Sequence, residues 1–162
     1  MPYAPFEEKF PAVARKETRS FQPISAPLLG NDEFGLLEMY CDEPGCDCRR
    51  VMFSVVSRQQ QKVVATIAYG WESAQFYTDW FGSHDPNIIQ ELQGPALNTM
   101  SPQSDLAPAL LPHIEWILQD VDYVNRLKRH YAMFRELVDK ETAVQSSSRR
   151  QRFKKPKRKK RR

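Results

Sequence analysis

Three cysteines lie within eight residues, and they are the only cysteines of the chain. Cys41, Cys46 and Cys48 follow a C-x4-C-x-C spacing around the pair Pro44 and Gly45. Because Pro and Gly favour a tight turn, this spacing predicts three thiolates close together without help from distant parts of the fold. Thiolate sulfur is a preferred ligand of zinc, which takes four ligands in a closed structural site. The run therefore predicts a zinc site.

The fourth ligand of such a site must come from outside the three cysteines. His130 is the candidate we favour, because it lies on the apolar stripe of a long predicted helix, where an imidazole faces the core or the sheet. Three alternatives stay open: His113, His84, and a carboxylate from Asp42 or Asp47. A water molecule in the fourth position would instead make the site catalytic.

The cysteines also have interpretations that involve no metal. They could be three free thiols, or Cys46 and Cys48 could form a redox pair, although a bridge across one residue would be strained. An odd number of clustered cysteines argues against a disulfide framework and favours metal or redox chemistry.

The elements that position these residues follow from hydrophobic periodicity. Alternating apolar residues predict strands over 34–40, 50–57 and 62–69, joined by short polar connections as an antiparallel meander with the cysteines at the tip of its first hairpin. The predicted apolar face of strand 50–57 consists of Val51, Phe53 and Val55. That of strand 62–69 consists of Val63, Ala65, Ile67 and Tyr69.

Helical signals follow the strands, which makes the predicted class α+β: a three-stranded antiparallel sheet, then about four helices. The helices are expected over 71–81 with a stop at Gly82, from Asp85 to residue 94, over 105–119 with a kink at Pro112, and over 121–141. An aromatic set in the first of them (Trp71, Phe76, Tyr77, Trp80 and Phe81) is typical of a core face.

The charge of the chain is divided between an acidic body and a basic tail. The net charge is +4, but residues 149–162 hold eleven Lys or Arg and no acid, so the first 148 residues carry a formal charge of −7. We therefore expect an extended N-terminal arm over 1–33, a metal-binding domain over 34–144, and a disordered basic tail over 145–162.

The basic tail predicts salt-sensitive, sequence-independent binding to nucleic acid, either RNA or DNA. It could also be a solubilising extension, a segment for other acidic partners, or a nuclear import signal. The predicted contacts to nucleic acid are Arg149, Arg150, Arg152, Lys154, Lys155, Lys157, Arg158, Lys159, Lys160, Arg161 and Arg162.

Three segments, Tyr40–Val51, Gly94–Asn98 and Arg126–Tyr131, are similar to bacterial proteins of unassigned function, some of them loosely related to the SEC-C type of metal-binding motif. That motif continues from C-x-C to a Cys-His or Cys-Cys pair, which this chain lacks. The resemblance implies metal binding and favours His130 over the other two histidines as a ligand. It implies no activity.

Other function classes find no support in the sequence. There is no P-loop, dinucleotide fingerprint or G-x-S-x-G motif, the N-terminus lacks the apolar run of a signal peptide, and no apolar stretch is long enough to span a bilayer. We therefore expect a cytoplasmic, non-enzymatic zinc-binding module that associates with nucleic acid and not with a membrane. A metal- or thiol-dependent enzyme and an adaptor that binds a protein partner are the alternatives.

Overall fold

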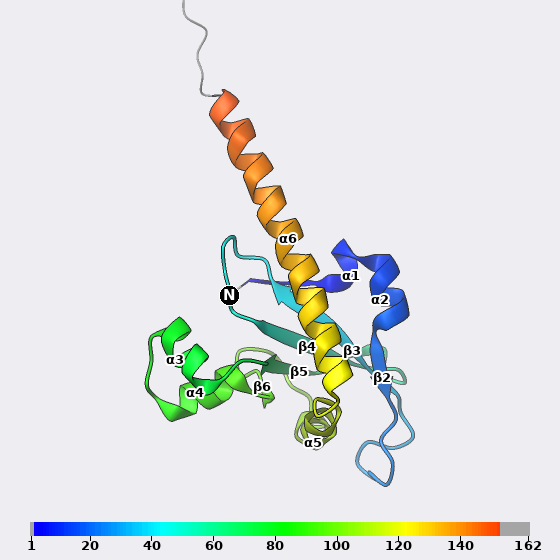
Figure 1. Cartoon of the computed structure of the whole chain (residues 1–162). Helices are drawn as coiled ribbons and strands as arrows, with labels where there is room; N and C mark the ends of the chain where they lie inside the picture. The colour runs from blue at the N-terminus through cyan, green and yellow to red at the C-terminus, as the bar shows by residue number, and fades with distance from the viewer. Residues whose placement is uncertain (1, 153–162) are drawn as a thin grey trace, which may run out of the picture.

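A computed structural model describes residues 2–152, and it confirms the predicted α+β class (Figure 1). All strand pairs in it are antiparallel and belong to one sheet. The described residues form six strands: β1 (Tyr3–Pro5), β2 (Arg19–Phe21), β3 (Phe34–Cys41), β4 (Arg50–Ser57), β5 (Lys62–Gly70) and β6 (Ala96–Leu97). They also form six helices: α1 (Phe6–Lys9), α2 (Pro11–Glu17), α3 (Ala74–Phe81), α4 (Pro86–Gln93), α5 (Ala107–Ile117) and α6 (Val121–Arg152).

The predicted meander is confirmed as the centre of the sheet, where β4 pairs with β3 on one side and β5 on the other. Its register places Leu36 opposite Val55 and Phe53 opposite Ile67, and all four side chains are fully buried. Successive residues of a strand point to opposite faces, so these four lie on one face of the sheet. Together with buried residues of α1, α5 and α6, they form the main core.

One predicted position on this face is wrong. The register shifts between Val55 and Val56, so Val56 pairs with Val63 while Val55 pairs with Ala65. The extra residue on β5 is Val64, which is buried, whereas Val63 is 49% exposed. A β-bulge changes the alternation of side chains at the point where it occurs, and a strict period of two cannot anticipate it.

The N-terminal segment was expected to be an extended arm without regular structure, beside a sheet of three strands. Instead, β1 and β2 both pair with β3 along one edge, and the short helices α1 and α2 lie between them. The buried ring of Phe6 anchors α1 to the core. Pro11 occupies the first turn of α2, where a missing N–H costs nothing. Together with β6, these pairings give a sheet of six strands.

The helices after the sheet begin and end near the predicted residues. Asp85 caps α4 by accepting a hydrogen bond from the backbone N–H of Asn87 at 2.9 Å, and Gly82 ends α3 in the left-handed conformation. Pro112 lies inside α5, which continues through it to Ile117.

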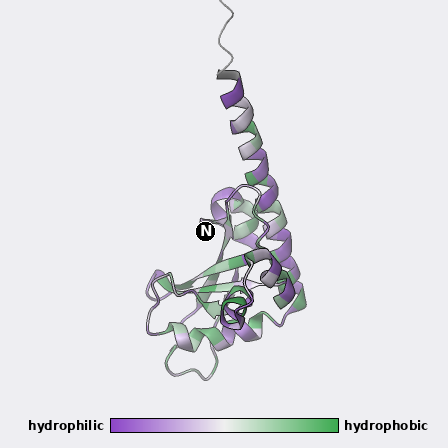
Figure 2. Ribbon diagram, turned by 90° about the vertical axis from the view of Figure 1, so that its left-hand side faces the viewer, coloured by the Kyte–Doolittle hydropathy of each residue, from purple (hydrophilic) through white to green (hydrophobic). Residues whose placement is uncertain are grey.

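Helix α6 is longer than predicted. It runs for 32 residues to Arg152, so residues 145–152 are helical and not part of a disordered tail; residues 153–162 lie outside the described part of the chain. No Gly or Pro interrupts the sequence from Val121 to Arg152, and an established helix adds residues at little cost. Its C-terminal part extends away from the body and is largely hydrophilic (Figures 1 and 2). In the described residues, no helix combines the length and apolar character needed to cross a membrane.

Candidate metal centre

The predicted cysteine cluster is present. Cys41 is the last residue of β3, while Cys46 and Cys48 lie in the loop that leads to β4. The three Sγ atoms all lie within 4.8 Å of one another, and none is in a disulfide. The loop turns at Gly45, whose φ of +71° suits a residue without Cβ, and the backbone N–H of Cys46 closes the turn on the carbonyl of Glu43 at 3.2 Å.

The cluster is buried on one side and accessible on the other. Cys41 and Cys48 are fully buried, whereas Cys46 is partly exposed. A hydrogen bond from the thiol of Cys48, the backbone N–H of Glu43 and the charge of Arg135 outweigh burial and lower the pKa of Cys41 to about 6. That thiolate and burial in turn raise the pKa of Cys48.

Burial and the Cys41 thiolate likewise raise the pKa of Cys46. The thiol of Cys41 is therefore the most acidic of the three. A divalent cation would favour ionisation of all three, because metal binding displaces the remaining protons.

Helix α6 holds the cysteine loop through three side chains spaced four residues apart. Arg135 donates from Nη1 to the backbone carbonyl of Cys41 at 2.8 Å. The hydroxyl of Tyr131 accepts from the backbone N–H of Arg49 at 3.2 Å, and Asp139 accepts from the N–H of Gly45 at 3.4 Å. Residues four apart share one helix face, so a single stripe of α6 fixes the start, turn and end of the loop.

Sequence reasoning missed this stripe. The spacing Tyr-x3-Arg-x3-Asp was a usable signal, because it places three hydrogen-bonding side chains on the face that also carries the apolar stripe.

The residue after the cluster, Arg49, is held in an unusual backbone conformation. Its φ is +49°, and the backbone is fixed from both sides, since Tyr77 donates its hydroxyl hydrogen to the Arg49 carbonyl at 2.9 Å while Tyr131 accepts from the N–H. The guanidinium of Arg49 lies over the ring of Phe76 and binds both oxygens of Asp47 at 2.9 and 3.0 Å. Asp47 is therefore engaged with this arginine.

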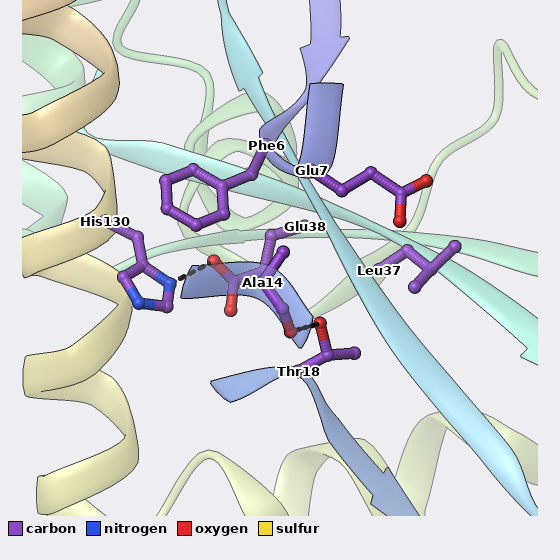
Figure 3. Close-up of a pocket in the computed structure, with 7 residues that line it drawn as sticks. All are labelled: Phe6, Glu7, Ala14, Thr18, Leu37, Glu38 and His130. Carbon is purple, nitrogen blue, oxygen red and sulfur yellow. Dashed lines mark hydrogen bonds and ion pairs between the residues drawn. The ribbon is translucent and has the colours of Figure 1, made fainter. Parts of the chain in front are cut away.

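The structure does not bring His130 to the sulfurs. Its Nδ1 lies 2.7 Å from Oε2 of Glu38, and its Nε2 lies 2.5 Å from Oε2 of Glu17 (Figure 3 shows the Glu38 contact). With both ring nitrogens occupied by carboxylates and the ring stacked on Phe6 at a centroid distance of 4.4 Å, His130 joins β3 and α2 to α6. The cysteine loop and α6 are joined instead by hydrogen bonds from side chains of α6 to the loop backbone.

The other candidates for a fourth ligand are also outside the group of ligand atoms that could hold a metal ion. His113 stacks on Phe21, and His84 is exposed at the start of α4. Neither they nor Asp42 and Asp47 belong to the group of ligand atoms around the sulfurs in the described residues.

The predicted nucleic-acid residues are only partly within the described chain. Arg149 and Arg150 are exposed on the projecting end of α6, and Arg152 is the last residue of that helix. The remaining eight predicted contacts fall in residues 153–162, which are not described: Lys154, Lys155, Lys157, Arg158, Lys159, Lys160, Arg161 and Arg162.

Comparison of the chain with protein-family models, with curated proteins and with solved structures finds no match. The resemblance to SEC-C-type proteins stays a prediction. The site can be described from its own geometry: three gathered sulfurs that could bind a metal ion, on a loop fixed to a long helix that ends in a basic segment.

Proposed function

We propose that this protein is a zinc-thiolate module whose basic C-terminal segment associates with nucleic acid. The observation that supports it is the gathering of Cys41, Cys46 and Cys48, with all three sulfurs within 4.8 Å of one another. The relationship to SEC-C-type metal-binding proteins is part of the same proposal.

Zinc suits this donor set for two reasons: the ligands are thiolates, and contacts with α6 already hold the loop in place. Thiolates are soft ligands that favour zinc over magnesium or calcium, which prefer oxygen. The loop is held by Tyr131, Arg135 and Asp139 through its backbone, so the sulfurs are free to bind an ion without rearrangement of these contacts. Zinc binding would then add directly to the stability of the folded chain, because the unfolded chain has no such site.

The nucleic-acid half of the proposal is supported by the position and charge of the C-terminal segment. Arg149 and Arg150 lie on the part of α6 that projects from the body, and nine further Lys or Arg follow them in the sequence. The acidic body, with its formal charge of −7, repels phosphate, so the distance between body and segment favours binding through the segment alone.

Two measurements test the two halves separately. Elemental analysis should find one zinc per chain, and a chelator should lower the melting temperature of the wild type but not of a variant with all three cysteines changed to serine. Binding to DNA and RNA should weaken steeply with salt, and deletion of residues 149–162 should remove that binding. Equal binding by the truncated chain would contradict the nucleic-acid half and leave the zinc half intact.

A further inference from the structure

The C-terminal part of α6 leaves the body as an exposed helix (Figures 1 and 2). Among the described residues, the ion pairs of α6 end at Glu141, which binds Lys9 at 2.9 Å. Every residue from Ala143 to Arg150 is exposed. A rise of 1.5 Å per residue gives the stretch from Glu141 to Arg152 a length of about 18 Å. A ligand can therefore reach this part of the helix without displacing any part of the body.

The projecting helix is positively charged and lies at a distance from the acids of the body. The sequence has no Asp or Glu after Glu141, whereas Arg149 and Arg150 are exposed in the last turn of the helix, and nine more Lys or Arg follow them. Arg149 lies about 12 Å beyond Glu141 along the helix axis, which exceeds the Debye length of about 8 Å at physiological salt. The acids of the body therefore do little to weaken the attraction of this helix for phosphate.

One face of the projecting helix combines short side chains with an arginine. Ala143, Ser146 and Arg150 share this face, because they are spaced by three and four residues. At about 100° per residue, they lie roughly 80–140° around the helix from Val138, which is buried in the core, so the face is turned away from the body. Short side chains let a helix approach a surface closely, and arginine forms paired hydrogen bonds with the edge of guanine.

The helical shape favours one kind of nucleic acid. An α-helix with its side chains is about 10–12 Å across, and the major groove of B-form DNA, about 12 Å wide, admits such a helix. The major groove of duplex RNA is deep and too narrow to be entered in this way. Single strands are bound by stacking of bases on aromatic side chains, and residues 143–150 contain no aromatic residue. Duplex DNA is therefore the nucleic acid that this helix fits.

We propose that the C-terminal part of α6 binds duplex DNA as a helix in the major groove, with the face of Ala143, Ser146 and Arg150 toward the bases. This proposal rests on the proposed association with nucleic acid and names its ligand. The part of α6 that packs on the body supplies the costly first turns, so the projecting end is already helical before DNA binds. Binding then orders few additional residues of the helix, which favours affinity.

The experiment measures the affinity of the full chain by fluorescence anisotropy for three probes of one sequence: a short DNA duplex, the same duplex as RNA, and the single DNA strand. The DNA duplex should bind about 10 times more tightly than the RNA duplex. Ser147→Pro keeps every charge but interrupts the helix, so it should remove this preference and leave the affinity for RNA and for the single strand unchanged.

The matched control is Ser147→Ala, which preserves the helix. The Ser147 hydroxyl donates to the carbonyl of Val144 at 2.8 Å within the helix, so its loss should leave binding to all three probes as in the wild type. Both variants should melt at the temperature of the wild type, because residue 147 is exposed and outside the core. Circular dichroism should show less helix in Ser147→Pro than in Ser147→Ala.

Three results would overturn the proposal while leaving the association with nucleic acid intact. The first is equal affinity of the wild type for the DNA and RNA duplexes. The second is equal affinity of Ser147→Pro and Ser147→Ala for the DNA duplex, because binding would then depend on charge alone. The third is an equal loss of affinity for all three probes in Ser147→Pro. A wild type that binds none of the probes would instead contradict the nucleic-acid half of the proposed function.

Discussion

The buried contacts of His130 predict a specific dependence of stability on pH. A neutral imidazole donates one hydrogen bond, whereas the imidazolium donates two, and ionised carboxylates only accept. Both ring nitrogens of His130 face carboxylate oxygens, at 2.7 Å for Glu38 and 2.5 Å for Glu17, so this geometry favours the imidazolium. Burial acts to lower the pKa of His130, but hydrogen bonds and charges of the two glutamates outweigh it and raise the pKa.

The raised pKa of His130 makes its contribution to stability larger at low pH than at high pH. Because the folded chain binds the His130 proton more tightly than the unfolded chain, the contribution to stability is complete below the unfolded pKa of about 6.5 and is lost as pH rises through the raised folded pKa. Within that window, this group lowers the free energy of unfolding by up to about 1.4 kcal/mol per pH unit.

The variant His130→Gln tests this pH dependence. The loss of stability that we expect from it is set by the environment of Glu38. The Glu38 side chain is 4% exposed and would keep only the hydroxyl of Tyr40, which donates to it at 2.8 Å. Removal of one partner of a buried ion pair costs about 3–5 kcal/mol, a large part of the roughly 5–15 kcal/mol that stabilises a typical domain. We expect a loss of this size at pH 6, smaller at higher pH.

The assay is urea unfolding followed by circular dichroism at pH 5.5–8.5. Wild type and variant are compared at each pH, so that the pH-dependent contributions of other groups, such as Cys41, cancel in the difference. His84→Gln is the matched control, because His84 is exposed, and it should follow the wild type. The double variant with Glu38→Gln should lose less than the sum of the two single losses, because the two residues are in contact. A stability difference between His130→Gln and wild type that stays constant over this pH range would refute the reasoning.

Other contacts give further predictions. Gly70→Ala should destabilise the fold by about 1–3 kcal/mol in thermal unfolding, because a Cβ there would lie 2.2 Å from the Tyr77 hydroxyl and 3.0 Å from the Leu92 carbonyl; an unchanged melting temperature would contradict this packing. Arg135→Ala should weaken zinc affinity about 10-fold or more in a competition titration, since it frees the backbone at Cys41, whereas Lys140→Ala, on the same helix, should not. The slope of log affinity for DNA against log salt should approach zero when residues 149–162 are deleted, and a retained slope would assign binding to the body.

Local signals in the sequence were sufficient for the central elements. Alternation of apolar residues at Val51, Phe53 and Val55 identified β4. Gly82 identified the C-terminal end of α3, and Asp85 identified the start of α4. The cysteine cluster was also predictable, because a short loop brings its members together whatever the rest of the chain does.

Contacts between distant segments were not predictable in this way. Strands β1 and β2 have three residues each, too few to show periodicity, and they are stable only because the edge of β3 supplies their partners. His130 was correctly expected to be buried, but its partners Glu17 and Glu38 are 113 and 92 residues away. Nothing near His130 in the sequence indicates that two carboxylates occupy its nitrogens and keep it from the sulfurs.

The central claim is that Cys41, Cys46 and Cys48 together bind one metal ion. The most direct test is elemental analysis of the purified full chain beside its three single Cys→Ser variants, combined with isothermal titration of zinc into the metal-free protein. The account predicts one zinc per wild-type chain and a large loss of affinity in each variant. A native chain that folds without metal, takes up no zinc, and melts at the same temperature with and without a chelator would contradict it.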